Sequence, residues 1–370
     1  MTSSANARDW LLICLLREFM IIFKRLLGNW SVRLAVAVRS ASFIVLGCGC
    51  AVAKADYALA AQAYAAGDFT TAQDEYRQLA EEGLAQAQYD LGIMLINGDG
   101  GVVDPAGAAK LFEAAAVQGH EASQYNLGVI KLRGLGVPQD FGNAFRWFSA
   151  VASPAQPSAC YNLALLYEQG KGTPVSASQA RHWFQVAAEA GHREAQYNLG
   201  QIYYEGVGGP ADLDLAVKWF SAAADQGSAE AQYNLAGLYY LGAGVEQDFA
   251  SAADWYRKAA EQGDPLAQFN LGRMYRFGEG VAEDPQLAAR WYQQAARQGD
   301  SYALNNLAYM TFNGLGVDED PVLALALFTL ANERGNANAS MAIELLRPQL
   351  GLDELKRAEE IARTWLSGDQ

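Results

Sequence analysis

Few side chains in this sequence could perform acid–base or nucleophilic chemistry. It has three histidines, His120, His182 and His192, and four cysteines. The histidines fall in separate repeats of the chain, and His120 and His192 each follow a glycine. A general base must lie within hydrogen-bonding distance of the proton that it removes. These scattered positions therefore predict exposed turn histidines, with no catalytic residues, no metal site and no cofactor.

Carboxamides, which could instead bind a peptide backbone, recur at a constant interval. One polar column advances by 36 residues each time, through Asp90, Asn126, Asn162, Asn198, Asn234, Asn270 and Asn306. These amides could form a ladder for a bound peptide or hydrogen bonds between repeats, and their presence in every repeat favours the structural role. A fixed period of this length is typical of a solenoid, in which each unit needs its neighbours.

Two helices are predicted in each repeat. In the first helix, an alanine such as Ala195 is followed four residues later by a leucine and five residues later by a small residue such as Gly200. These spacings place the three residues on one face of the helix. Two glycines such as Gly206 and Gly208 follow, and glycine can take the left-handed conformation that ends a helix. The second helix is predicted to begin at a capping aspartate, or at Ser176 in one repeat. The aspartates are Asp104, Asp140, Asp212, Asp248, Asp284 and Asp320.

The second helix repeats a small residue followed three positions later by a large one. The large column is Leu111, Trp147, Trp183, Trp219, Trp255, Trp291 and Leu327. Small against large at helical spacing predicts that the two helices interdigitate through this column. Each repeat is therefore predicted to be a helical hairpin. The irregular stretch from Val151 to Ser158 contains two prolines and indicates an altered turn, or else a change of pitch.

The pattern resembles a known family. Residues 195–200 read Ala-Gln-Tyr-Asn-Leu-Gly, and they are followed by Tyr203, Gly206, Gly208, Ala216, Trp219, Phe220, Ala223, Ala224 and Gly227. This is similar to the Sel-one-like repeat, a relative of the tetratricopeptide repeat, over about residues 84–335. The resemblance implies an all-α fold, an α-solenoid forming a right-handed superhelix of antiparallel helix pairs, with seven 36-residue repeats. It also implies an adaptor or scaffold in protein complexes, often in bacterial envelopes or in signalling.

Some members of that family carry a cysteine pair in every repeat and bind or hydrolyse penicillins. Those pairs are missing here, because Cys160 is the one cysteine after residue 55. It replaces a glutamine that five of the other repeats carry, at Gln88, Gln124, Gln196, Gln232 and Gln268. We interpret Cys160 as a packing residue rather than a reactive thiol.

The resemblance further implies that the first helices line the concave surface of the solenoid. Two columns on these helices vary between repeats while their neighbours are constant, as expected of a surface tailored to a ligand. Tyrosine and arginine concentrate binding energy at interfaces, and two arginines on an acidic protein would select an anionic segment. The predicted partner-binding residues are Gln201, Tyr204, Tyr240, Arg273, Arg276, Tyr309 and Phe312. The alternative is a solvated, unoccupied face.

The ends and the charge of the array bear on its partners. Residues 56–83, a tetratricopeptide-like hairpin, and residues 336–370 are predicted to cap the array, because terminal repeats would otherwise expose apolar faces.

The sequence has 27 basic and 41 acidic residues, of which seven basic and two acidic residues lie in residues 1–55. The rest of the chain therefore has 20 basic and 39 acidic residues, a net charge of −19. Such an acidic body repels phosphate backbones, so nucleic acid is not an expected partner.

Residues 1–55 resemble an export leader. Basic residues precede an apolar run from Ala41 to Ala53, and the small residues Ala53 and Ala55 stand where a signal peptidase would cleave. The run is shorter than the roughly 18 to 20 residues of a spanning helix. The leader is longer than usual, and Met20 is an alternative start. The mature protein is predicted to begin near Asp56 and to be exported, to the periplasm or into the medium.

A lipid anchor is an alternative outcome for the same leader. Residues 45–48, Val-Leu-Gly-Cys, resemble the lipobox at which bacterial lipoproteins are cleaved and acylated. Cys48 would then carry the lipid, which is the one membrane contact that the sequence indicates. Leu46 is uncommon at its position, which favours a Cys48 that is removed with the signal.

Together these patterns predict a non-enzymatic scaffold or adaptor that binds one or more envelope proteins or peptides on the concave face. Two alternatives stay open. A small-ligand receptor or a hydrolase of the cell-wall or β-lactam type would need a convergent set of catalytic groups in the groove. A secreted effector would act on another cell.

Overall fold

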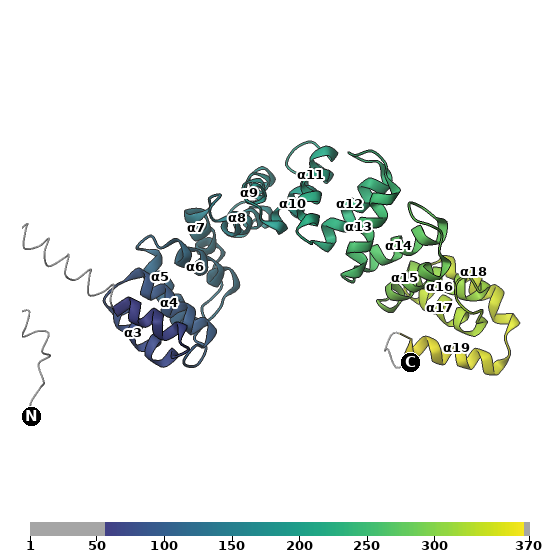
Figure 1. The fold of residues 1–370 in the computed structure, drawn as a ribbon, viewed down its shortest axis with the longest axis horizontal. Helices are drawn as coiled ribbons and strands as arrows, with labels where there is room; N and C mark the ends of the chain where they lie inside the picture. Colours follow the sequence, from purple (N-terminus) through teal and green to yellow (C-terminus); the bar gives the residue numbers. More distant parts are fainter. Residues whose placement is uncertain (1–55, 366–370) are drawn as a thin grey trace, which may run out of the picture. The chain divides into compact units, whose positions relative to one another are not determined.

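The computed structural model describes residues 56–365, and every regular element in that range is helical. Within each compact part of the chain, most consecutive helices pack against one another (Figure 1). The prediction of an all-α solenoid is confirmed, whereas the hand of its superhelix stays a prediction. The predicted leader, with Met20 and Cys48, lies outside the described residues. None of the helices between residues 56 and 365 has the length and apolar character needed to span a bilayer.

The chain divides into two compact units. The first extends to Ser123 and also takes in residues 135–137. It contains a helix over residues 56–65, α3 (Phe69–Glu81), α4 (Ala85–Asn97) and α5 (Pro105–Ala116). The second unit holds most of α6 (Glu121–Arg133) and everything after residue 137.

The helices that follow in the second unit are α7 (Phe141–Val151), α8 (Pro157–Gln169), α9 (Ala177–Glu189), α10 (Arg193–Glu205), α11 (Leu213–Asp225), α12 (Ala229–Leu241), α13 (Phe249–Glu261), α14 (Pro265–Phe277), α15 (Pro285–Arg297), α16 (Ser301–Asn313), α17 (Pro321–Glu333), α18 (Asn338–Leu346), the 3₁₀ helix η1 (Arg347–Gln349) and α19 (Leu352–Thr364). The even-numbered helices α4 to α16 are the first helices of the repeats, and the odd-numbered helices α5 to α17 are the second helices. From α8 onward, each first helix packs between two second helices, one from its own repeat and one from the repeat before.

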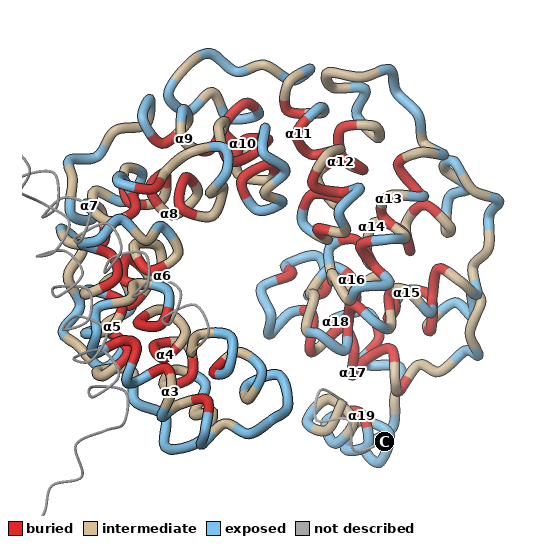
Figure 2. Tube along the Cα trace, turned by 60° about the vertical axis from the view of Figure 1, so that its left-hand side comes forward, coloured by how far each residue is buried: buried red, intermediate tan, exposed pale blue. Residues whose placement is uncertain are grey.

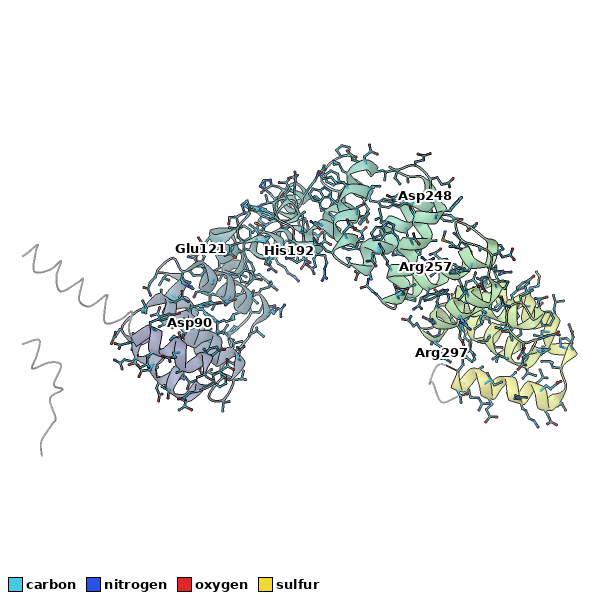
Figure 3. All side chains as sticks on the ribbon, in the orientation of Figure 1. Asp90, Glu121, His192, Asp248, Arg257 and Arg297 are labelled. Atoms are coloured by element: carbon cyan, nitrogen blue, oxygen red, sulfur yellow. The ribbon has the colours of Figure 1, made fainter. Side chains whose placement is uncertain are left out.

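Aspartates begin the second helices, as predicted. Asp248, labelled in Figure 3, precedes α13, and its carboxylate accepts hydrogen bonds from the backbone N–H groups of Ala250 and Ser251, at 2.9 and 3.2 Å. The aspartates before α5, α7, α11, α15 and α17, and Ser176 before α9, cap their helices in the same way. These bonds satisfy backbone donors that the first turn of a helix leaves unpaired.

The later first helices are capped as well, although no repeated pattern in the sequence indicated it. Asp264 and Asp300 cap α14 and α16, Ser228 caps α12, and His192 caps α10. The Nδ1 atom of His192 accepts a hydrogen bond from the Ala195 N–H at 3.3 Å, and the side chain is 15% exposed. The prediction of an exposed turn histidine is therefore wrong for His192, because the ring is held against the helix that it caps.

A pair of glycines ends each first helix, as α10 illustrates. Gly206 (φ 75°) ends the helix in the left-handed conformation, and Gly208 (φ 70°) follows in the same region. A Cβ atom at Gly208 would lie 2.8 Å from the backbone oxygen of Ala177 at the start of α9. The second glycine therefore lets the loop approach the preceding repeat closely, in addition to turning the chain.

The aromatic residue that fills each hairpin stands one position later than the sequence analysis predicted. A Cβ atom at Gly200 would lie 2.6 Å from the Phe220 ring, so this ring packs directly on the backbone of α10. The equivalent residues, at most 5% exposed, are Phe112, Phe148, Phe184, Phe220, Tyr256, Tyr292 and Phe328. Buried residues follow the faces where neighbouring helices meet (Figure 2).

The prediction that the tryptophan and leucine column forms the core of each hairpin is therefore wrong. Although Trp219 and Leu327 are buried, Trp147, Trp255 and other members are only partly buried. Trp183 instead packs at the margins of two neighbouring core clusters. Residues three and four positions after the alanine share one helix face, and only the packing of the second helix against the first decides which of them is enclosed.

Hydrogen bonds between repeats are made by buried glutamines. Gln196 on α10 is 6% exposed, and its Nε2 donates to the Ala188 carbonyl of α9 at 3.1 Å. Its Oε1 accepts a bond of 2.7 Å from Gln226 Nε2, which also donates to the Gly191 carbonyl at 3.1 Å. The bonds to the upstream carbonyl and from the downstream glutamine recur at Gln88, Gln232 and Gln268. Each buried carboxamide is thus satisfied while it links consecutive repeats.

Three members of the asparagine column make hydrogen bonds within their own helix, and Asn306 also accepts one from Arg276 of the preceding repeat. Asn162, Asn270 and Asn306 donate to the carbonyl four residues earlier, at 2.8 to 3.0 Å. Cys160, which stands in the glutamine column, is fully buried, and its Sγ donates to the Ser153 carbonyl at 3.3 Å. Burial raises the pKa of the Cys160 thiol, as expected of a cysteine that packs in a core.

Candidate functional site

The predicted partner-binding residues all lie on first helices of the second unit. Gln201 and Tyr204 are on α10, Tyr240 is on α12, and Arg273 is on α14. These four residues line one open hollow of about 340 Å³, which we call the tyrosine hollow. The structure thus brings together residues from three consecutive repeats, spread over positions 201 to 273 of the sequence. Repetition of one helix hairpin is what places them side by side.

Four tyrosines surround this hollow. Tyr204 and Tyr240 were predicted, whereas Tyr233 on α12 and Tyr256 on α13 were not. Tyr256 is 5% exposed and forms part of the floor. Burial raises the pKa values of Tyr233, Tyr240 and Tyr256, so these phenols stay neutral around neutral pH. The hollow therefore presents uncharged rings with hydroxyl groups.

The hollow opens beside Gly237, in the middle of α12. Gly237 belongs to a column whose neighbouring members are Gln201 and Arg273, and it is the member without a side chain. The carboxamides of Asn234 and Asn270 complete the polar part of the lining. The glycine was visible as an exception in a variable column, but only the packed helices show that the missing side chain leaves a hollow.

Arg273 is held in place by an aromatic ring and a carboxylate. Its guanidinium carbon lies 4.5 Å from the centroid of the Tyr240 ring. Its Nε lies 3.7 Å from Glu279 Oε2, which also accepts a hydrogen bond from the Tyr240 hydroxyl at 3.2 Å. The charge of Arg273 is thus partly compensated, since a pair at this distance attracts without a direct hydrogen bond.

Arg276, one turn further along α14, has a neutral amide as its hydrogen-bond partner in place of a carboxylate. Its Nη1 donates to Asn306 Oδ1 at 3.0 Å, and its guanidinium carbon lies 4.7 Å from the Tyr309 ring centroid. Between residues 56 and 365, no carboxylate forms an ion pair with Arg276, in contrast to Arg273. Tyr309 is 44% exposed, whereas Phe312 packs against the core cluster of the last repeat. Arg276 and Tyr309 therefore form a cationic and aromatic surface beside the hollow.

The groups that line the tyrosine hollow are suited to binding rather than to acid–base catalysis. Its lining residues include no histidine, cysteine, aspartate or glutamate. His192 lies elsewhere, where it stacks on Tyr161 with ring centroids 4.7 Å apart. His120 contacts Ser123 Oγ through Nδ1, at 2.9 Å, and Gln86 Oε1 through Nε2, at 3.1 Å. Both rings are half-buried structural residues, and residues 56–365 contain no cluster of potential metal ligands.

Comparison with known proteins identifies the repeat. A profile of the Sel1 repeat matches seven consecutive segments, residues 85–120, 121–152, 157–192, 193–228, 229–264, 265–300 and 301–336. The chain belongs to the Sel1 repeat family. Proteins with Sel1 repeats are generally protein–protein interaction scaffolds, and the fold is typically non-enzymatic. The resemblance to the Sel-one-like repeat is thereby confirmed.

Solved structures of Sel1 repeat proteins are similar to this chain. One is a Sel1 repeat protein from Oxalobacter formigenes, 30% identical over 86% of this chain and 95% of its own, with a TM-score of 0.62. Another is c5321, a protective antigen of uropathogenic Escherichia coli with an SLR fold, 27% identical over 86% of this chain and 85% of its own, with a TM-score of 0.45. A search of curated proteins found no match. The first structure independently supports the assignment of the fold.

Proposed function

We propose that this Sel1 repeat protein is a non-enzymatic adaptor that binds a protein partner through the first helices of its later repeats. The tyrosine hollow is the observation that carries the proposal. Positions that vary between repeats meet around one cavity there, on three consecutive first helices. Tyrosine and arginine side chains in such a surface are those that contribute most to protein interfaces.

The partner that we propose is a protein or peptide of the bacterial cell envelope, bound on the concave face. Support for export comes from the leader-like residues 1–55, with their basic segment, apolar run and small residues at a cleavage position. The net charge of −14 disfavours nucleic acid, because phosphate backbones are repelled by an acidic protein. Cell fractionation tests the location, and recovery of the chain with cytoplasmic markers would contradict export.

Substitutions on the binding surface test the adaptor proposal. Tyr204 and Tyr309 are 47% and 44% exposed, so replacing each with alanine should change the stability little. The double variant, and separately Arg276→Glu, should lose a partner that the wild-type chain captures from envelope extract by chemical crosslinking. Arg297→Glu is the matched control, because Arg297 is exposed at the end of the second helix α15 (Figure 3).

The outcomes separate binding from misfolding. All variants should stay folded, with a slightly lower melting temperature for Arg276→Glu because it loses the bond to Asn306, and the Arg297→Glu variant should keep the partner. If the wild-type chain captures no partner, or if the double variant and Arg276→Glu capture it as well as the wild type does, the later first helices are not the binding surface.

A further inference from the structure

Gly237 has no packing role in its repeat. A Cβ atom there would meet only the Tyr256 hydroxyl, at an ordinary distance of 3.7 Å. At Gly200 and Gly272, by contrast, a Cβ atom would lie 2.6 and 2.9 Å from an enclosed aromatic ring. Glycine in the middle of a helix is unfavourable compared with alanine. Since neither packing nor helix formation requires glycine at 237, we attribute it to the hollow that the missing side chain opens.

The size of the tyrosine hollow suits one large side chain. Its volume is about 340 Å³, and an apolar cavity of about 150 Å³ is known to admit benzene. The hollow therefore has room for an aromatic ring together with part of the backbone that carries it. The buried Phe220 and Tyr256 form the floor, and the more exposed Tyr204 stands at the rim. Aromatic rings pack favourably on one another in edge-to-face and offset arrangements.

The polar groups around the hollow suit an extended and acidic chain. Arg273 is the one cationic residue in the lining, which has no carboxylate, and Arg276 lies one turn further along α14. A carboxylate next to the bound ring would be attracted to these guanidinium groups. The carboxamides of Asn234 and Asn270 offer donors and acceptors for a peptide main chain. Glu279 partly compensates Arg273, so Arg276 supplies the positive charge that complements an anion, although the protein as a whole is acidic.

We infer that the tyrosine hollow binds an aromatic side chain from an extended, acidic segment of the partner protein. The inference rests on the proposed function and specifies the chemistry of the partner. The aromatic ring enters beside Gly237, the flanking main chain lies against the carboxamides, and a neighbouring aspartate or glutamate faces Arg273 and Arg276.

A library of random twelve-residue linear peptides, displayed on phage and selected on the full chain, tests this inference. Selected peptides should contain an aromatic residue next to an aspartate or glutamate. Synthetic copies should bind the wild-type chain about tenfold or more tightly than Gly237→Leu, measured by fluorescence anisotropy. The leucine side chain fills the hollow, and because a Cβ atom is tolerated at Gly237, this variant should melt at or above the wild-type temperature.

Arg276→Gln should weaken binding of the acidic peptides and not of copies whose acidic residues are replaced by asparagine or glutamine. Failure to enrich any peptide, enrichment without the aromatic and acidic pattern, or equal binding to Gly237→Leu would each overturn the inference. The proposed function has a separate test, which is the crosslinking of a partner to the full chain. It is refuted if this partner is retained both by Arg276→Glu and by the double variant Tyr204→Ala, Tyr309→Ala. A folded Gly237→Leu chain that keeps this partner refutes the hollow alone.

Discussion

Replacing Gln196 with alanine tests the glutamine bonds that join the repeats. The substitution removes the 3.1 Å bond from Gln196 Nε2 to Ala188 and deprives Gln226 of its 2.7 Å acceptor. Two bonds of about 0.5 to 1.5 kcal/mol each give about 1 to 3 kcal/mol. The lost side-chain packing adds to this cost, and the higher helix propensity of alanine offsets a few tenths of a kcal/mol. We expect the free energy of opening around α9 to α11 to fall by about 2 to 3 kcal/mol.

Native-state hydrogen exchange is the suitable assay, because a repeat array does not have to unfold in one step. A fall of this size should speed amide exchange in α9, α10 and α11 by roughly 30- to 150-fold. Gln196→Met, which largely keeps the side-chain volume, separates the lost hydrogen bonds from the lost packing. Gln179→Ala on α9 is the control, because Gln179 is exposed. An acceleration below about threefold, or an equal one in the control, would refute the role given to the glutamines.

Three further predictions follow from single residues. Gly237→Ala should raise the stability by about 0.5 to 1 kcal/mol in urea denaturation, because helix propensity improves and a Cβ atom fits there; a loss of stability would show that the space beside Tyr256 is needed for folding. Burial lowers the pKa of His192, so the unfolded chain binds more protons below about pH 6.5, and the stability present above that pH is lost as the pH falls toward the folded-state pKa. His192→Asn, which keeps an N-cap, should reduce this dependence of the urea midpoint on pH; an unchanged profile would assign it to other groups. Cys160, buried and with a raised pKa, should react with a thiol reagent only on unfolding in a chain lacking residues 1–55, and rapid labelling of the folded protein would contradict its burial.

Local patterns in the sequence predicted the repeat and its helix ends correctly. The aspartates before the second helices and the left-handed glycines after the first helices act through residues within a few positions along the chain. Such interactions depend on the local backbone, and a sevenfold repetition makes each of them readable. The caps of the later first helices, including His192, were not predicted, because those residues differ from repeat to repeat.

The candidate site was predicted in part. Variation between repeats pointed to Gln201, Tyr204, Tyr240 and Arg273, which do line one hollow. It did not identify Tyr256 in the floor of the hollow. Tyr256 lies on a second helix, and the preceding residue, Trp255, was predicted to pack inside the hairpin instead. Nor did it predict the ion pair between Glu279 and Arg273, because the loop that carries Glu279 lies beside Arg273 only in the folded repeat.

Periodicity and capping are properties of short segments, so the amino-acid sequence was sufficient to predict the fold class, the 36-residue register and the ends of most second helices. Tertiary structure decided which of two neighbouring positions is enclosed, as with Phe220 rather than Trp219 against Gly200. It also decided that glutamines join the repeats and that Gly237 opens a hollow. Residues three and four positions apart share a helix face, so only contact with the neighbouring helix distinguishes them.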